Sequence, residues 1–225
     1  LTITGSGEDN DMGFTFGSAE KAWPKLQIKD LGILTIDGAT VNLNTAASGT
    51  NTSGNQVGVD VGAAHIIISN GAQVNLNNNT SVSGNRANTM LRGTVIDVTG
   101  ADTEVNIGNS NLSGSTTTKN TRAVLGYMEQ YNEDGSLQYS GSKITITDAT
   151  INLQGAVVDL NDGEASNKNP VLGGVKGYGA RIDGKTLNMT NATLNVKADH
   201  SLTGSGGGYG GAGGILQVHE STLTN

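Results

Sequence analysis

The sequence repeats one chemically distinctive residue, an asparagine placed between two apolar residues. It occurs in stretches such as Val41-Asn42-Leu43 and Ile151-Asn152-Leu153. Alternate side chains of an extended strand point to opposite faces, so each asparagine faces away from the side on which its apolar neighbours are buried. We therefore expect these asparagines to stack as a row of amides on one face of the protein. The asparagines in this register are Asn42, Asn75, Asn106, Asn152 and Asn195.

The chemistry of the amide allows two interpretations of this row. In the first, the stacked amides satisfy one another's hydrogen bonds and keep that face soluble. In the second, the row binds the same row on another copy of the chain. Hydrogen bonds of roughly 0.5–1.5 kcal/mol each would then act together as a multivalent zipper.

A second group with binding chemistry is a cluster of tyrosines. Tyr127, Tyr131 and Tyr139 lie in one insert, residues 126–143, in a chain with 4% aromatic residues. The run Glu133-Asp134-Gly135 predicts a turn, so that the insert is a projecting loop or hairpin. Aromatic side chains near Glu and Asn suit a sugar or protein ligand, and binding residues favour loops on a rigid scaffold. The alternative is that the tyrosines cover the exposed side of the fold.

Carboxylates are the third group, since glycoside hydrolysis uses two of them and a polysaccharide lyase needs a base to abstract a proton. The candidate carboxylates stand beside Gly and Asn, where acidic side chains commonly accept backbone hydrogen bonds in turns. No two of the three histidines lie at metal-ligand spacing. We expect no catalytic residue, metal site or cofactor, with a polysaccharide-active lyase or hydrolase as the alternative. The acidic residues considered are Glu8, Asp9, Asp11, Asp159, Asp162 and Glu164.

The asparagines recur because the chain repeats a motif: apolar-x-apolar, a tight bend, a small residue, then apolar-Asn-apolar. The clearest copies are residues 34–43, 144–153 and 187–196. Successive copies lie 29 to 46 residues apart, a spread that a helical repeat of fixed length does not show. The inserts between copies are rich in Gly, Asn, Ser and Thr and have no helical periodicity. The sequence therefore predicts an all-β repeat.

A further short apolar segment follows each insert, for example residues 57–61 and 123–125. Three short strands in each repeat predict a solenoid whose coils stack in parallel about 4.8 Å apart. We expect residues 1–225 to form a single solenoid segment of about six to seven coils with protruding loops.

Composition agrees with a thin core and excludes several classes of protein. Only 35% of residues are hydrophobic, while Gly, Asn, Thr and Ser make up nearly half the chain, which cannot fill a broad core. The net charge is -7 and the 13 Lys and Arg residues are scattered singly, so no basic stripe is present for nucleic acid. The absence of cysteine excludes disulfides and cysteine-ligated zinc. No apolar run approaches the roughly 18 residues of a membrane helix, so we expect no membrane insertion.

The repeats and their polar excursions resemble the right-handed parallel β-helix of autotransporter passenger domains and filamentous haemagglutinin-type bacterial surface adhesins. The resemblance spans residues 34–224 and is more specific for the fold than for one family, since pectin-lyase-like enzymes and phage tailspikes share this architecture. It implies an extracellular protein on the bacterial cell surface, anchored in the outer membrane by a region outside this chain. It also implies adhesion to a host protein or glycan, or homotypic contacts as in a biofilm. We therefore expect this chain to be a fragment of a longer passenger.

Overall fold

The computed structural model describes most of the repeats and omits parts of the inserts between them. The described residues are 1–5, 13–16, 25–43, 49–50, 57–76, 82–83, 86–108, 119–127, 130–131, 134–139, 141–159, 178–202 and 212–225.

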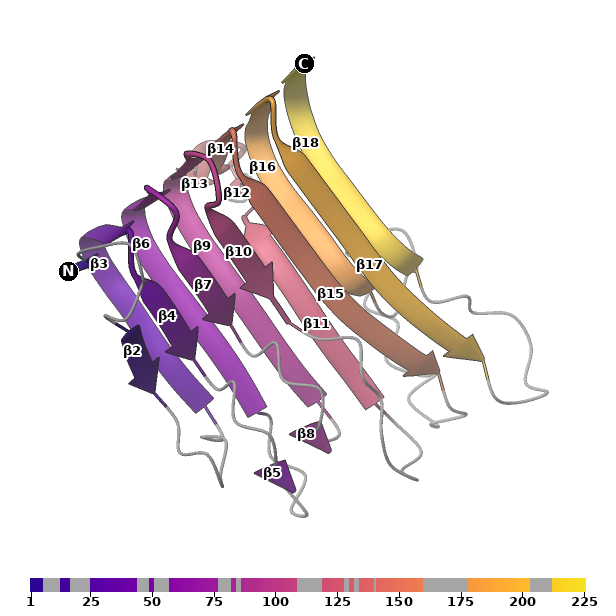
Figure 1. Ribbon diagram of the computed structural model, residues 1–225. Helices are drawn as coiled ribbons and strands as arrows, with labels where there is room; N and C mark the ends of the chain where they lie inside the picture. Colours follow the sequence, from indigo (N-terminus) through magenta and orange to yellow (C-terminus); the bar gives the residue numbers. More distant parts are fainter. Residues whose placement is uncertain are drawn as a thin grey trace.

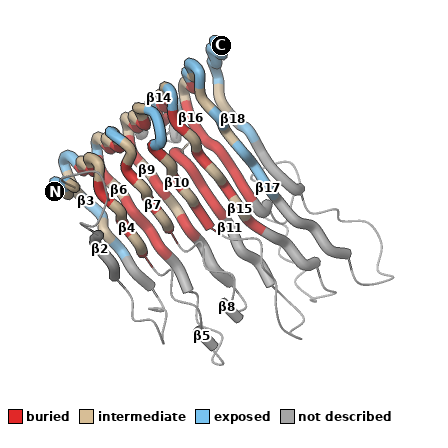
Figure 2. Tube along the Cα trace, viewed as in Figure 1, coloured by how far each residue is buried: buried red, intermediate tan, exposed pale blue. Residues whose placement is uncertain are grey.

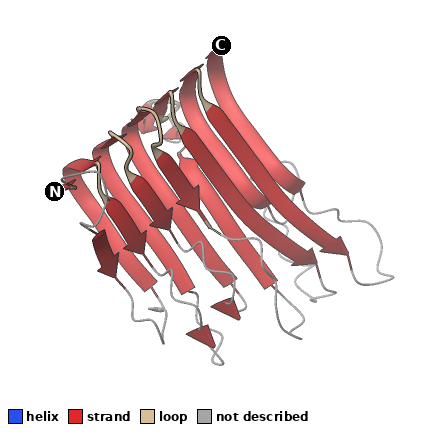
Figure 3. Ribbon diagram, viewed as in Figure 1, coloured by secondary structure: helices blue, strands red, loops and turns tan. Residues whose placement is uncertain are grey.

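Most of these residues form strands, and most of the strands assemble into two parallel sheets (Figures 1 and 3). The short strands β5 (Gly49–Thr50) and β8 (Val82–Ser83) pair with each other, apart from these sheets. Here we call the two parallel sheets the long-strand sheet and the short-strand sheet. The long-strand sheet contains β1 (Thr2–Thr4), β3 (Lys25–Asp37), β6 (Val57–Ser69), β9 (Arg86–Thr99), β11 (Lys119–Gly126), β14 (Lys143–Thr147), β16 (Tyr178–Thr190) and β18 (Ala212–Thr224). The short-strand sheet contains β2 (Gly13–Phe16), β4 (Thr40–Leu43), β7 (Gln73–Leu76), β10 (Glu104–Ile107), β15 (Thr150–Asp159) and β17 (Thr193–Leu202).

The strands of each sheet follow one another in sequence order and pair in register with the equivalent strand of the next repeat. β4 pairs with β7, β7 with β10, β10 with β15 and β15 with β17, all in parallel. On the other side β3, β6 and β9 pair in the same way. This arrangement confirms the all-β prediction and is consistent with a parallel β-helix. The two sheets also meet directly where residues 119–121 of β11 pair antiparallel with residues 156–158 of β15.

Tight turns join β3 to β4, β14 to β15 and β16 to β17, and their sequences explain their shape. The turn residue has a left-handed backbone, with φ of 59° at Gly38, 54° at Asp148 and 46° at Asn191. Glycine, aspartate and asparagine tolerate this conformation better than other residues. An alanine follows in each case, and Ala39 and Ala149 are buried because only a small side chain fits inside the turn.

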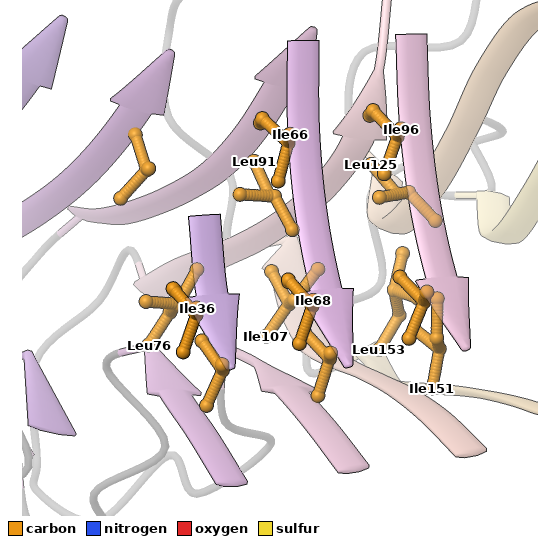
Figure 4. Close-up of a cluster of buried hydrophobic side chains, with 14 of the residues drawn as sticks. Ile36, Ile66, Ile68, Leu76, Leu91, Ile96, Ile107, Leu125, Ile151 and Leu153 are labelled. Atoms are coloured by element: carbon orange, nitrogen blue, oxygen red, sulfur yellow. The ribbon is translucent and has the colours of Figure 1, made fainter. Parts of the chain in front are cut away.

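The core is a narrow layer of Ile, Leu and Val between the two sheets (Figures 2 and 4). The short strands alternate between half-buried and buried residues, as in Gln73–Leu76. Across the layer, Ile68 and Ile96 of the long-strand sheet belong to the same core cluster as Ile107 and Leu153 of the short-strand sheet. A thin interior of this kind needs few apolar residues, which agrees with the composition.

The structure joins two of the three strands predicted for each repeat. The segments 57–61 and 66–68 form one strand, β6. Their separation persists as a change of phase, because odd-numbered positions such as Val61 and Ala63 are buried before residues 64 and 65, and even-numbered positions, Ile66 and Ile68, are buried after them. β9 changes phase in the same way between Gly93 and Ile96. We call this bend in the long strands the corner.

Several strands extend into regions that the sequence predicts as inserts. β15 and β17 continue to Asp159 and Leu202, and β16 begins at Tyr178. The added parts of β15 and β17 lack the apolar alternation that marks a strand, and residues 197–199 of β17 are small or charged. Their strand structure comes from the parallel pairing of β15 with β17, which continues to the end of both strands.

Truncating single side chains of one core row should show how strongly the stability of the stack depends on its interior. Ile107 is fully buried, while Val196 occupies the same register row at the end of the stack and is 41% exposed. Ile107→Ala should lower the free energy of unfolding by about 2–5 kcal/mol, and Val196→Ala by less than about 1 kcal/mol. Urea unfolding measures both values. Equal losses would contradict a core that is closed at Ile107 and open at Val196.

Candidate functional site

The five predicted asparagines form one continuous ladder on the outer face of the short-strand sheet. The Nδ2 group of each asparagine donates to the Oδ1 atom of the preceding one. The distances are 2.9 Å from Asn75 to Asn42, 2.9 Å from Asn106 to Asn75, 2.8 Å from Asn152 to Asn106 and 2.8 Å from Asn195 to Asn152. In-register parallel pairing places the amide of each asparagine beside the amide of the following asparagine in the stack. The row predicted from the sequence is therefore present, and its amides bond along the row.

A second polar row runs beside the ladder on the same face. It consists of Thr40, Gln73, Glu104, Thr150 and Thr193, which pair with one another in register. Glu104 links the two rows, because its Oε1 atom accepts a hydrogen bond of 2.9 Å from Nδ2 of Asn152. We call the ladder and this second row together the ladder face.

The outer face of the long-strand sheet has a different character. One of its register rows reads Thr35, Ile67, Asp97, Thr145, Asn188 and Thr222. Residues of this row also contact residues of the neighbouring row. For example, His65 Nε2 lies 2.7 Å from Asp97 Oδ2. A row of mixed side chains cannot build a ladder of identical groups, so the uniform row is a property of the short-strand sheet.

The tyrosine-bearing insert interrupts a long strand at the corner. β11 and β14 pair with the two halves of β9, so together they take the place of one long strand. Between them β12 (Gln130–Tyr131) and β13 (Leu137–Tyr139) pair antiparallel. The turn that joins them has Gly135 at φ 82°, and the Asp134 carboxylate accepts hydrogen bonds from the Ser136 hydroxyl and N–H at 2.6 and 2.9 Å. These bonds lower the pKa of Asp134.

Ser142 closes the insert at its base. Its N–H donates to the carbonyl of Tyr127 at 2.9 Å, and its Oγ accepts from the N–H of Tyr127 at 2.9 Å. The same hydroxyl donates to the carbonyl of Gly93 on β9 at 2.6 Å. Gly126, with φ of 78°, precedes this closure, and a Cβ atom there would lie 2.1 Å from the carbonyl oxygen of Asp183. The ends of the insert are therefore held firmly against the long-strand sheet.

All three predicted tyrosines lie within this insert. The hydroxyl of Tyr127 lies 2.6 Å from Oγ1 of Thr94, which fixes the ring over the corner of β9. Tyr131 and Tyr139 lie on the paired strands β12 and β13, and their side chains are outside the described residues. The structure thus separates Tyr127 from the asparagine ladder, since the two lie on different sheets.

The acidic residues considered for catalysis fall mostly outside the described part of the chain. Asp159 is the last residue of β15, and the others, Glu8, Asp9, Asp11, Asp162 and Glu164, are not described. Among the described residues, no group of three or more His, Asp or Glu side chains could hold a metal ion. A helix long and apolar enough to cross a membrane is likewise not found in that part.

Two ionic clusters were not found from the sequence. On outward positions of the long strands, Asp60 contacts Lys29 and Arg92, and Arg181 contacts Asp183. Arg92 pairs in register with Gly62 and not with Asp60, so this contact runs diagonally between coils and does not show as a repeated row. A search for opposite charges two residues off register would have revealed it.

Burial sets the electrostatics of the second cluster. Arg181 and Asp183 are both 7% exposed. Desolvation raises the pKa of Asp183, and the hydrogen bond and charge of Arg181 offset part of that rise. Folding therefore favours the protonated form of this carboxyl group.

Comparison of the chain with protein-family models, with curated proteins and with solved structures finds no match.

Replacing Asp183 should change how stability depends on pH. Because its folded pKa is raised, the stability that Asp183 contributes is present below its usual pKa and is lost as pH rises through the folded value. Asp183→Asn keeps the neutral form, so its stability relative to wild type should increase as the pH rises above about 4, the usual pKa of an aspartate. Urea unfolding of both proteins at each pH measures this difference. A constant difference between the two proteins would contradict the assignment.

Ser142 should be required for the stable base of the insert. Ser142→Ala removes two hydrogen bonds from a fully buried group and should lower the free energy of unfolding by about 1–3 kcal/mol. Ser136→Ala, in the exposed turn of the same insert, serves as the control and should cost less than about 1 kcal/mol. Thermal and urea unfolding measure both variants. If Ser142→Ala costs no more than Ser136→Ala, the closure at Ser142 is dispensable.

Proposed function

We propose that the two sheets form a right-handed parallel β-helix of about six to seven coils and that the chain is a segment of a bacterial surface adhesin. The sequential parallel pairing of both sheets supports a β-helix. Connections between parallel strands are right-handed in nearly all proteins, which supports the handedness. The role is adhesion without catalysis, on the outside of the cell, with anchoring supplied by a region outside this chain.

The observation that carries the proposal is the asparagine ladder. An amide offers two donor hydrogens and two acceptor lone pairs. At Asn106 the ladder uses one donor, to Asn75, and one lone pair, from Asn152. The second N–H and the second lone pair are then available to a partner. The ladder face therefore combines a rigid row with spare hydrogen-bonding capacity at Asn106, whereas Asn152 uses both of its N–H groups, on Asn106 and on Glu104.

The spacing of this face suits another copy of the same chain. In-register strands repeat at about 4.8 Å, so an identical face on a second molecule presents its groups at the same interval. Each hydrogen bond contributes little, but the bonds form together once the first pairs are aligned. Such contacts are weak singly and strong when many molecules meet at a cell surface. We therefore propose homotypic adhesion through the ladder face as the main role, with host proteins or glycans as further partners of the inserts.

Sedimentation velocity across protein concentration tests this role. Replacing Asn106, Asn152 and Asn195 by Lys adds three positive charges to the ladder face and should abolish self-association of the wild type. Replacing Thr145, Asn188 and Thr222 by Lys is the matched control, because it adds the same charge to the opposite sheet, on the coils of Asn152 and Asn195 and on the coil that follows them. The control should associate like the wild type. Circular dichroism establishes that each variant is folded.

Two results would contradict homotypic adhesion through this face. One is a wild type that stays monomeric at every concentration. The other is a loss of association in both Lys variants, which would attribute the effect to net charge alone.

A further inference from the structure

A groove crosses the long-strand sheet at the corner and lies apart from the ladder face. It passes over β3, β6 and β9 and ends at Tyr127, which follows β11, and its volume is about 540 Å³. Pockets that bind small ligands commonly have volumes of about 300–1,000 Å³. The four strands are neighbours about 4.8 Å apart, so the groove runs along the stack for about 14 Å. We call it the corner groove.

Small residues of β6 form the floor of the groove. β6 places Gly62, Ala63 and Ala64 between Lys29 of β3 and Arg92 of β9. A Cβ atom on Gly62 would lie 3.8 Å from the backbone oxygen of Arg92 and 3.9 Å from Cγ of Lys29, so the longer residues stand close on either side. Since Ala64 is exposed, the floor is open to solvent.

A β-bulge in β3 brings an additional residue, Asp30, to the groove. The pairing of β3 with β6 shifts between Ile28 and Leu31, so β3 has one residue more than β6 at this point. Asp30 has a left-handed backbone, with φ of 59°, which is uncommon for a residue other than glycine. Bulges and strained positions of this kind cluster at functional sites, where they aim a side chain. Within the described part of the chain the exposed Asp30 carboxylate makes no hydrogen bond or ion pair, so it can accept from a ligand.

The charges around the groove cancel one another. The buried Asp60 carboxylate contacts both Lys29 and Arg92, and Asp30 supplies a second negative charge. Two cations are therefore balanced by two carboxylates. Lys29 also has a partner besides Asp60, so the proposal gives it no role. A groove without net charge selects its ligand by hydrogen bonds and shape, which favours an uncharged polar molecule.

Arg92 and Tyr127 complete the set of binding groups. Nε and Nη2 of Arg92 donate to Asp60 at 2.7 to 3.1 Å, which fixes the guanidinium group and leaves its Nη1 donors for a ligand. Tyr127 supplies an aromatic ring at the end of the groove, where its hydroxyl lies 2.6 Å from Oγ1 of Thr94. Sugar hydroxyls both donate and accept hydrogen bonds, and the C–H face of a sugar ring packs on an aromatic ring. The acceptor of Asp30, the donors of Arg92 and the ring of Tyr127 match these properties.

We propose that the corner groove binds a short neutral oligosaccharide, with sugar hydroxyls at Asp30 and Arg92 and one sugar ring against Tyr127. The groove is elongated across four coils, which suits an extended chain such as β-1,4-linked glucose. This site goes beyond the proposed homotypic adhesion, because it lies on the other sheet and uses none of the ladder residues. Either activity can therefore be lost without the other.

Isothermal titration calorimetry with cellotriose, a neutral β-1,4-linked trisaccharide, tests the proposal. Cellotriose should bind the wild type with a Kd of about 1 mM or below, and a weaker affinity would overturn the proposal. The Kd should change by less than about twofold between low and high salt, because the ligand carries no charge to be screened. Trigalacturonic acid, an anion, and triglycine, a zwitterion, are the comparisons for charge. If either binds more tightly than cellotriose, the groove recognises charge and the proposal is wrong.

Asp30→Gly separates a role in binding from a role in the fold. Glycine adopts the left-handed backbone without strain, so the variant should remain as stable as the wild type in urea and should bind cellotriose at least about tenfold more weakly. Asp148→Gly is the matched control, because Asp148 is also exposed, has φ of 54° and lies in a turn outside the groove. The control should bind like the wild type. Unchanged binding by Asp30→Gly, or an equal loss in both variants, would overturn the assignment.

Ala64→Tyr tests the same site from its floor. The tyrosine fills the exposed part of the floor and should weaken cellotriose binding by at least about tenfold. Asn188→Tyr, on an exposed position of the same sheet outside the groove, should bind like the wild type. Circular dichroism establishes that both variants are folded, and if Ala64→Tyr is not, Asp30→Gly decides. Unchanged binding by a folded Ala64→Tyr variant would place the sugar elsewhere and contradict the proposal.

Discussion

In-register parallel pairing is the constraint on which the rest of this structure depends. Each strand places its residues beside the equivalent residues of the next repeat, at about 4.8 Å. Any side chain that recurs at one position therefore becomes a row. Rows of Ile, Leu and Val face inward and make the core, while the row of asparagines faces outward and bonds to itself. The same pairing rule thus generates both stability and a repetitive surface.

The two outer faces use this constraint in different ways. The short-strand sheet keeps the same residue type in one row and gains a uniform ladder. The long-strand sheet varies its outward residues, and its charges pair diagonally, as Asp60 does with Arg92. Variation on this sheet leaves room for local features, including the insert between β11 and β14. One face is repetitive and suited to many equal contacts, whereas the other can hold a single defined site.

Most of the repeat and the ladder could be predicted from the sequence, because both depend on local patterns. Alternation around Asn42 and Asn152 marks the strands, and the residue before Ala39 and Ala149 marks the turn. The ends of β15 and β17 could not be predicted, since residues such as Lys197 are strand residues only through pairing with a distant segment.

The closure of the insert by Ser142 has a consequence for how this protein can change over generations. The two ends of the insert are held 2.9 Å apart, from the Ser142 N–H to the Tyr127 carbonyl, whatever lies between them. The entropy cost of a longer loop grows only slowly with its length. New segments can therefore be exchanged at this point without disturbing the neighbouring strands. The described turn of the insert, residues 134–136, is exposed, so the insert also offers a position at which foreign peptides can be grafted.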